Sequence, residues 1–359
     1  MPRFPIPRCI AGKLTAKRSA LAQAKGTAAP ASRSHRAIAL GIACQSLASC
    51  SGVQSALAPA AEEAEQVATL FWVMAAGGFI IWLLVVALSL YASRRNSRPV
   101  GERAAGRLIV LGGVVLPVTV LTALLSYTLW LMPSLRPFAG GEGVDLRVEI
   151  VGHQFWWEVL YHRQDGSTVI SANEVRLPAG ERVEFELTSS DMIHSFWIPA
   201  LGGKMDLVPG RINRMSFRPT KTGTYRGQCA EFCGTSHARM AFPVVVMQPA
   251  DLDAWLDERS GSSAGFGTNV EGRRVFDREQ CGQCHRIDGA AGGLFKGPDL
   301  SHVGSRLTIG AGYLNNTTDQ LARFIVNPGS VKPGAHMPAS PHLSALELDQ
   351  LARWLKGLR

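Results

Sequence analysis

Two long uncharged segments constrain the fold of this chain more than any other feature of its sequence. Residues 67–92 form an uncharged run of 26 residues, and residues 108–135 form a second run of 28. A helix needs about 20 mostly apolar residues to cross a bilayer. Both runs exceed this length, so we expect a transmembrane hairpin within residues 51–142 of a multidomain membrane protein. A hairpin of buried helices in a soluble protein fits this length poorly.

The loop between the two runs predicts how the hairpin is oriented. Its one acid is Glu102, and its basic residues are Arg94, Arg95, Arg98, Arg103 and Arg107. Loops rich in arginine stay on the cytoplasmic side of a membrane. Both ends of the mature chain should therefore lie outside. Trp72 and Trp130 are expected to anchor the outer ends of the helices at the interface.

The first 50 residues read as an export signal that is removed. Residues 1–36 carry eight basic side chains and no acid, and an apolar run follows over residues 37–47. The formal net charge of +9 is therefore concentrated in this segment, and the nearly neutral remainder excludes nucleic acid as a partner. The sequence Leu47-Ala48-Ser49-Cys50 resembles a bacterial lipoprotein signal, in which Cys50 is lipidated. An ordinary signal peptide, or a start codon downstream of Met1, is the alternative.

A cluster of soft metal ligands lies between residues 229 and 240. It contains Cys229, Cys233, His237 and Met240, and His194 precedes it by 35 residues. Thiolate, imidazole and thioether together favour copper, and this set can bind two copper ions with both sulfurs bridging. A closed zinc site would leave Met240 unused. A Cys229–Cys233 disulfide is allowed in an exported protein, but the softness of the whole set favours copper.

The pattern C-x-E-x-C-x3-H-x2-M, with His194-Ser195-Phe196 and Val208-Pro209-Gly210-Arg211 before it, resembles subunit II of the haem–copper cytochrome c oxidases. That subunit carries the dinuclear copper centre CuA. The resemblance implies that the side-chain ligands are His194, Cys229, Cys233, His237 and Met240. It also implies that Glu231 offers its backbone carbonyl to copper. The carboxylates of Glu231 and Asp206 would then hold a magnesium ion at the junction with subunit I.

A second motif, Cys281-Gly282-Gln283-Cys284-His285, has the C-x-x-C-H pattern of covalent haem c attachment. Cys281 and Cys284 would form thioethers, and His285 would bind the iron. Met337 is the expected second axial ligand, which would raise the reduction potential. His336 competes for this role, and a methionine that only packs the core is the other alternative. Residues 269–359 resemble a fused cytochrome c domain, as in the caa-type oxidases.

Residues 143–258 carry the signals of an all-β sandwich. Apolar and polar residues alternate within residues 146–150 and 183–187, and glycine and proline turns separate the strands. The resemblance specifies a cupredoxin. Phe155 stands where the family usually has the tryptophan that receives electrons. Phe155 and Trp156 are therefore the candidate entry residues, and Trp157 is expected to pack the sandwich.

The rest of the chain is predicted to be a linker and an all-α domain. Residues 259–268 are rich in serine and glycine, which favours a flexible linker. Helical spacing of apolar residues is found over residues 270–280, 318–326 and 343–358. Of the seven cysteines, Cys9, Cys44 and Cys50 fall in the signal. The other four are claimed by copper and haem, which indicates a redox protein.

These features predict the electron-transfer subunit of a terminal oxidase in the bacterial cell (inner) membrane, with its copper and haem domains outside. The resemblance implies a route from an upstream donor through haem c and CuA to subunit I, with subunit III as a further partner. A free-standing carrier would have no use for a magnesium site at Glu231. Nitrous oxide reductase would need a histidine-rich catalytic domain, and only nine histidines are present. Residues 107–116 lack the acid that many members of the resembled family carry there, so either another residue serves proton entry or protons enter differently.

Overall fold

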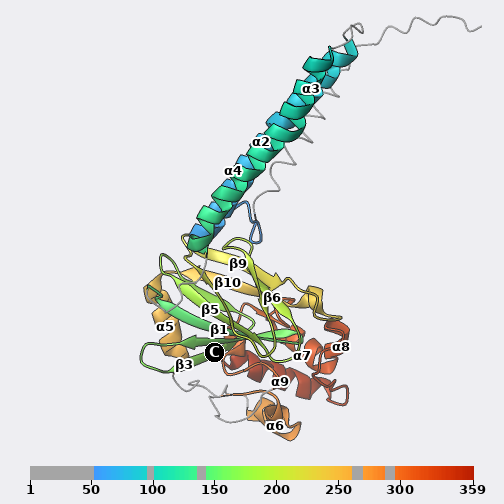
Figure 1. Ribbon diagram of the computed structural model, residues 1–359. Helices are drawn as coiled ribbons and strands as arrows, with labels where there is room; N and C mark the ends of the chain where they lie inside the picture. Colours follow the sequence, from blue (N-terminus) through green and yellow to red (C-terminus); the bar gives the residue numbers. More distant parts are fainter. Residues whose placement is uncertain (1–51, 95–100, 136–142, 261–269, 288–295) are drawn as a thin grey trace, which may run out of the picture. The chain divides into compact units, whose positions relative to one another are not determined.

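The computed structural model describes residues 52–94, 101–135, 143–260, 270–287 and 296–359 (Figure 1). The predicted signal segment with Cys50 and nearly all of the predicted linker lie outside these ranges. Within them, the chain forms two apolar helices, a β sandwich and a helical domain, in that order. The predicted fold class is confirmed.

The two apolar segments form helices that are long and apolar enough to cross a membrane, by length and composition. The first is α2 (Glu62–Arg94), with a mean hydropathy of 2.5. The second spans Glu102–Leu131, with a mean hydropathy of 2.6, and consists of α3 (Glu102–Val110), the π-helical turn η2 (Leu111–Val115) and α4 (Leu116–Leu131). The π turn ends two residues before Pro117. Proline has no N–H to donate to the preceding turn, so the change of helical hydrogen bonding accommodates it.

The β domain consists of two five-stranded sheets, which Figure 1 shows as two layers. The first sheet has the order β3 (Thr168–Ala172), β2 (Trp156–His162), β1 (Leu146–His153), β5 (Val183–Ser189) and β8 (Asn213–Phe217). The second has the order β4 (Val175–Pro178), β10 (Ala241–Met247), β9 (Gly223–Cys229), β6 (His194–Trp197) and β7 (Lys204–Leu207). The β1–β5 and β4–β10 pairs are parallel, and the other pairs are antiparallel.

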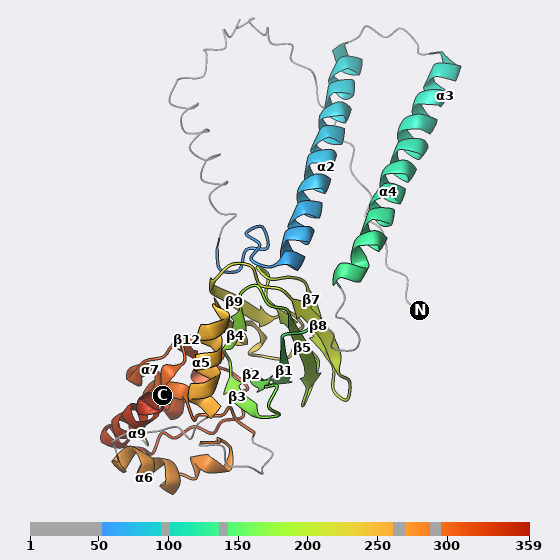
Figure 2. The ribbon, with the colours of Figure 1, turned by 90° about the vertical axis from the view of Figure 1, so that its left-hand side faces the viewer.

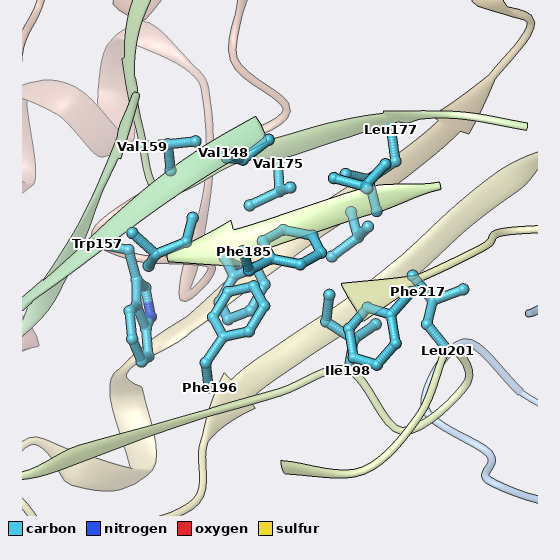
Figure 3. Close-up of a cluster of buried hydrophobic side chains, with 14 of the residues drawn as sticks. Val148, Trp157, Val159, Val175, Leu177, Phe185, Phe196, Ile198, Leu201 and Phe217 are labelled. Atoms are coloured by element: carbon cyan, nitrogen blue, oxygen red, sulfur yellow. The ribbon is translucent and has the colours of Figure 1, made fainter. Parts of the chain in front are cut away.

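The core of the sandwich lies between the two sheets (Figure 3). Val148 and Phe185 come from one sheet and Phe196 from the other, and all three are fully buried. Trp157 makes edge-to-face contacts with the rings of Phe196, at 5.8 Å, and Phe242, at 5.4 Å. Such aromatic contacts add stability beyond that of area burial. Trp157 therefore packs the sandwich, as predicted from the sequence.

The C-terminal domain contains four α-helices in the part of the chain that the structure describes, and Figure 2 labels α6, α7 and α9. They are α6 (Val270–Arg278), α7 (Thr318–Val326), α8 (Pro328–Val331) and α9 (Ala345–Gly357). Helix α9 begins with a capping box between Ser344 and Glu347. A Cβ atom on Gly272 would lie 2.3 Å from the backbone oxygen of Gln350, so the contact between α6 and α9 requires glycine.

Candidate copper and haem sites

Paired strands of the second sheet bring the predicted copper ligands together. His194 begins β6, Cys229 ends β9, and the two strands pair through Phe196 and Cys229. The loop that follows Cys229 carries the remaining ligands before the chain enters β10 at Ala241. Binding residues on loops that a rigid sandwich holds in place are a common arrangement for a functional site.

The five side chains lie within reach of one another. The Cys229 Sγ and Cys233 Sγ atoms are 3.8 Å apart, and both cysteines are free and buried. Cys229 Sγ is 3.9 Å from His194 Nδ1, and Cys233 Sγ is 3.7 Å from His237 Nδ1 and 3.8 Å from Met240 Sδ. The backbone oxygen of Glu231 is 3.2 Å from Cys229 Sγ. The atoms that would bind copper therefore converge on one point, and the donor set fits two copper ions.

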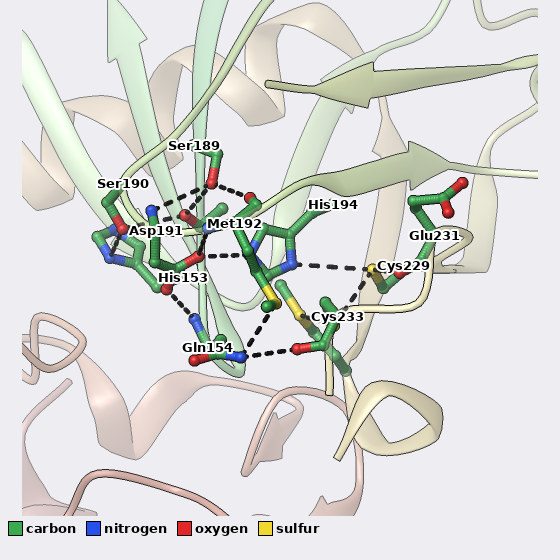
Figure 4. A network of polar contacts seen from close by, with 12 residues as sticks. His153, Gln154, Ser189, Ser190, Asp191, Met192, His194, Cys229, Glu231 and Cys233 are labelled. Carbon is green, nitrogen blue, oxygen red and sulfur yellow. Dashed lines mark hydrogen bonds and ion pairs between the residues drawn. The ribbon is translucent and has the colours of Figure 1, made fainter. Parts of the chain in front are cut away.

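A carboxylate that the sequence analysis missed orients His194 (Figure 4). Asp191 Oδ1 lies 2.8 Å from His194 Nε2, and the backbone N–H of Gln154 donates to Asp191 Oδ2. The bond at Nε2 leaves Nδ1 facing Cys229. Metal-binding histidines usually bond a carboxylate or carbonyl through their second nitrogen. An acid three residues before a candidate histidine was the signal that could have identified Asp191.

The metal-free site holds protons that copper would have to displace. The contact with Cys233 lowers the pKa of Cys229 well below its usual range, and the same contact raises the pKa of Cys233. Burial opposes a proton on His194, but hydrogen bonds to Asp191 and Cys229 raise the pKa of His194 to about 9. At neutral pH the site therefore contains a thiolate, a thiol and an imidazolium.

We expect copper uptake by the metal-free protein to tighten as the pH rises towards about 9 and to release protons, because copper binds thiolate and neutral imidazole. Calorimetric titration in two buffers with different ionisation enthalpies counts the protons released. Replacing Asp191 with Asn should lower the pKa of His194 and reduce that number. Replacing the exposed Asp165 in the same way should not. Copper binding that is independent of pH over this range would contradict the assignment.

The two acids predicted to bind magnesium share a partner. Lys204 Nζ lies 3.7 Å from Asp206 Oδ1 and 3.8 Å from Glu231 Oε2, and all three side chains are about half exposed. The two carboxylates therefore face a common position next to the copper site. This position already attracts one positive group, and hard oxygen ligands of this kind suit magnesium.

An apolar cavity in the C-terminal domain fits the predicted haem. Its walls include both predicted axial ligands, His285 and Met337, and are otherwise largely apolar. The Nδ1 atom of His285 is 2.9 Å from the carbonyl oxygen of Pro298, which leaves Nε2 available for iron. A Cβ atom on Gly297 would lie 2.7 Å from the His285 ring, so only glycine allows this approach. His336 is exposed and does not line the cavity, which favours Met337 as the second axial ligand.

The candidate entry residues lie next to the copper loop. Phe155 and Trp156 are both buried, and Trp156 stacks on His153 with ring centroids 4.1 Å apart. Phe155 contacts both domains: its ring lies against Gly234 of the copper loop, and its carbonyl oxygen accepts a hydrogen bond from Lys332 Nζ of the C-terminal domain. Sequence reasoning missed Lys332. No local pattern could have identified it, because the two partners are 177 residues apart.

Two family models match consecutive parts of the chain. Residues 162–248 match the model described as cytochrome C oxidase subunit II, periplasmic domain. Residues 270–359 match the model described as cytochrome c. The first match covers most of the β domain, and the second covers the helical domain whose apolar cavity is lined by His285 and Met337.

Three similar proteins are described as cytochrome c oxidase subunit 2, one of them as probable. A cytochrome c oxidase subunit 2 of Alkalihalophilus pseudofirmus is 40% identical over 59% of this chain and 61% of its own length. One of Bacillus subtilis is 29% identical over 85% of this chain and 92% of its own length. A Rickettsia bellii protein described as "Probable cytochrome c oxidase subunit 2" is 31% identical over 52% of this chain and 74% of its own length.

Among solved structures, the periplasmic domain of subunit II of cytochrome oxidase from Bradyrhizobium japonicum is 30% identical. It covers 33% of this chain and 94% of its own, with a TM-score of 0.31. The Rickettsia relative is matched over most of its length, and the periplasmic-domain model coincides with the strands and loop that hold the two buried cysteines. On these grounds, the chain belongs to the cytochrome c oxidase subunit 2 family.

Proposed function

We propose that this chain is the electron-transfer subunit of a haem–copper terminal oxidase. Electrons from a donor in the respiratory chain would pass through haem c to a dinuclear copper centre and on to subunit I, where oxygen is reduced to water with proton pumping. The observation that carries this proposal is that one chain contains two separate groups of side chains suited to hold redox cofactors. One consists of Cys229 and Cys233 with sulfurs 3.8 Å apart, and the other is the cavity between His285 and Met337.

The residues at the two sites have distinct roles in this proposal. Cys229, Cys233, His194, His237 and Met240 would hold copper, and Asp191 would keep the His194 ring in position. Cys281 and Cys284 would bond the haem covalently, and His285 and Met337 would bind its iron. The apolar walls of the haem cavity would exclude water from the iron. A mostly buried set of ligands changes little on gaining an electron, which suits fast transfer.

The proposed location is the bacterial inner membrane, with both redox domains on the outer side. The two apolar helices support membrane anchoring, and the arginine-rich loop between them supports a cytoplasmic position for that loop. Subunit I, and also subunit III, would contact these helices. Cys50, if it is lipidated, would add an anchor at the outer surface.

We expect Glu231→Gln to retain copper but to weaken an interfacial magnesium ion, since the variant keeps the backbone carbonyl and neutralises the carboxylate. The measurement is metal content of the purified oxidase, with manganese substituted for magnesium and followed by electron paramagnetic resonance. Asp206→Asn should weaken the same ion. Loss of copper together with retention of manganese would contradict the proposal that the Glu231 carbonyl binds copper and its carboxylate binds magnesium.

Purification from membranes tests the proposal as a whole. The chain should co-purify with a larger subunit, and the optical spectrum should show haem c together with the haems of subunit I. A preparation that contains haem c and copper but no oxygen-reducing partner would instead identify a free-standing electron carrier. That result would overturn the proposed function.

A further inference from the structure

Residues 331–334 of the cytochrome domain lie directly on the copper loop. Thr235 Oγ1 and Ser236 Oγ both donate hydrogen bonds to the carbonyl oxygen of Pro333, at 2.8 and 2.7 Å. Arg239 donates to the carbonyl oxygen of Val331. Three side chains of the loop that carries the copper ligands therefore hold the backbone of the cytochrome domain.

Glycine is required at the closest point of this contact. Gly334 has a φ of +79°, and a Cβ atom there would lie 2.5 Å from Thr235 Oγ1 and 3.4 Å from the Phe155 ring. A second part of the cytochrome domain also contacts the β domain, since the Ala241 N–H donates to the carbonyl oxygen of Ala311 at 2.9 Å. Arg226 Nη1 donates to the carbonyl oxygen of Gly312 at 3.0 Å. The contact therefore involves two loops of the cytochrome domain.

Lys332 occupies the centre of this contact and connects the two redox sites. Its side chain is only 3% exposed. Its ammonium donates to the carbonyl oxygen of Phe155 and, at 3.2 Å, to that of Gly310. Gly310 lines the haem cavity. One side chain thus touches the wall of the haem cavity and the residue next to the copper loop.

Phe155 continues the connection to the copper site. Its ring packs on Gly234, where a Cβ atom would lie 3.1 Å from Phe155 Cζ. The preceding residue, Gln154, donates from Nε2 to the carbonyl oxygen of Cys233 at 2.8 Å (Figure 4). Gly234 and Cys233 are adjacent in the copper loop, so the position of Phe155 is linked to that of a copper ligand.

A lysine at such a position needs an explanation, because lysine is almost never fully buried unless it is paired. Burial lowers the pKa of Lys332 to about 7, and the neighbouring Cys233 opposes this shift. A methionine of similar length would avoid the cost of desolvation. What methionine cannot do is donate hydrogen bonds to carbonyl groups of two domains.

We propose that Lys332 is a positioning residue that fixes the cytochrome domain on the copper domain and so sets the contact through which electrons pass between them. This role rests on the proposed function, because it concerns transfer from haem c to copper. In this proposal, the contact consists of Phe155 from the copper domain and of Gly310 and Lys332 from the cytochrome domain. Lys332 determines where the two domains meet.

The test compares Lys332→Met with the wild type in the assembled oxidase, after both cofactors have been shown to be present at wild-type content. The Ala241 amide crosses between the domains, so its hydrogen exchange reports docking. We expect its protection to fall about tenfold in Lys332→Met, the effect of losing one buried hydrogen bond between the domains. The rate of copper reduction after photoreduction of haem c should fall, while reduction of haem c by an external donor stays unchanged.

Two further variants separate positioning from general damage. Lys356→Met is the matched control, because Lys356 Nζ donates at 2.7 Å to the carbonyl oxygen of Gly304 within the cytochrome domain. It should leave both the exchange and the transfer rate at wild-type values. Lys332→Arg keeps a charged donor and should retain most of the protection.

Should Lys332→Met fail to assemble, Thr235→Val removes another hydrogen bond of the same contact at constant shape and should lower the protection of Ala241. Wild-type protection and transfer rate in Lys332→Met would overturn the proposal. If the wild-type oxidase itself shows no transfer from haem c to copper, the proposed function is wrong. In that case, hydrogen exchange of the Ala241 amide still tests whether Lys332 positions the cytochrome domain.

Discussion

Replacing Cys233 with serine should abolish the dinuclear copper centre. The sulfur of Cys233 is within 4 Å of the Cys229, His237 and Met240 ligand atoms, so its loss affects most of the donor set. A serine oxygen is harder than thiolate and is a poor bridge for copper. Electron paramagnetic resonance of the wild type should show one unpaired electron shared by two coppers. The variant should lose this signal completely, and Cys229→Ser should do the same.

The same chemical change at another cysteine provides the control. Cys281→Ser removes a predicted thioether bond to haem and should leave the copper signal intact. A wild-type spectrum with the hyperfine pattern of a single copper, at one metal per chain, would refute the dinuclear assignment. Retention of the shared-electron signal in either copper-loop variant would exclude that cysteine as a bridge.

Met337→Leu should lower the reduction potential of haem c and slow the reduction of copper. A methionine opposite histidine raises the potential of haem iron, and changes of axial ligand shift it by on the order of 0.1 V or more. Leucine keeps the apolar volume at the cavity wall but cannot bind iron. Potentiometric titration gives the shift in potential, and stopped-flow reduction by an external donor shows whether copper still follows haem.

His336→Leu is the matched control, because His336 is the exposed neighbour of Met337. In this variant, the reduction potential of haem c and the rate of copper reduction should equal those of the wild type. A normal potential in Met337→Leu together with a low one in His336→Leu would assign the second axial position to histidine. Copper reduction at the wild-type rate in Met337→Leu would mean that electrons bypass the haem.

The architecture could be predicted from the sequence wherever the pattern is local. The uncharged runs predict the two helices, and residues 318–326 form α7 with the predicted limits. Alternating residues predict β1 and β5. The last helix is slightly shorter than predicted, because Ser344 caps it and Leu343 belongs to the turn that precedes the cap. Hydrophobic spacing alone does not contain that information.

The copper ligands could be predicted because four of them lie within twelve residues of one another. The groups that support them come from distant parts of the chain. Gln154 reaches Cys233 across 79 residues, and Lys332 reaches Phe155 across 177. Such contacts depend on which strands become neighbours and on how one domain rests on another. A single sequence contains no periodic signal for either, so Lys332 could only be found from the three-dimensional arrangement.

The separation of 3.8 Å between the sulfurs of Cys229 and Cys233 also governs how the copper site can be assembled. Thiols on the outer side of a membrane meet an oxidising environment, and a thiolate with a lowered pKa is the form that reacts. Before copper arrives, a small movement is enough to join the two sulfurs as a disulfide, which would remove both bridges. Copper binding to this chain therefore competes with oxidation of the Cys229 and Cys233 thiols. If the disulfide forms first, a reductant must reopen it before the chain can bind copper.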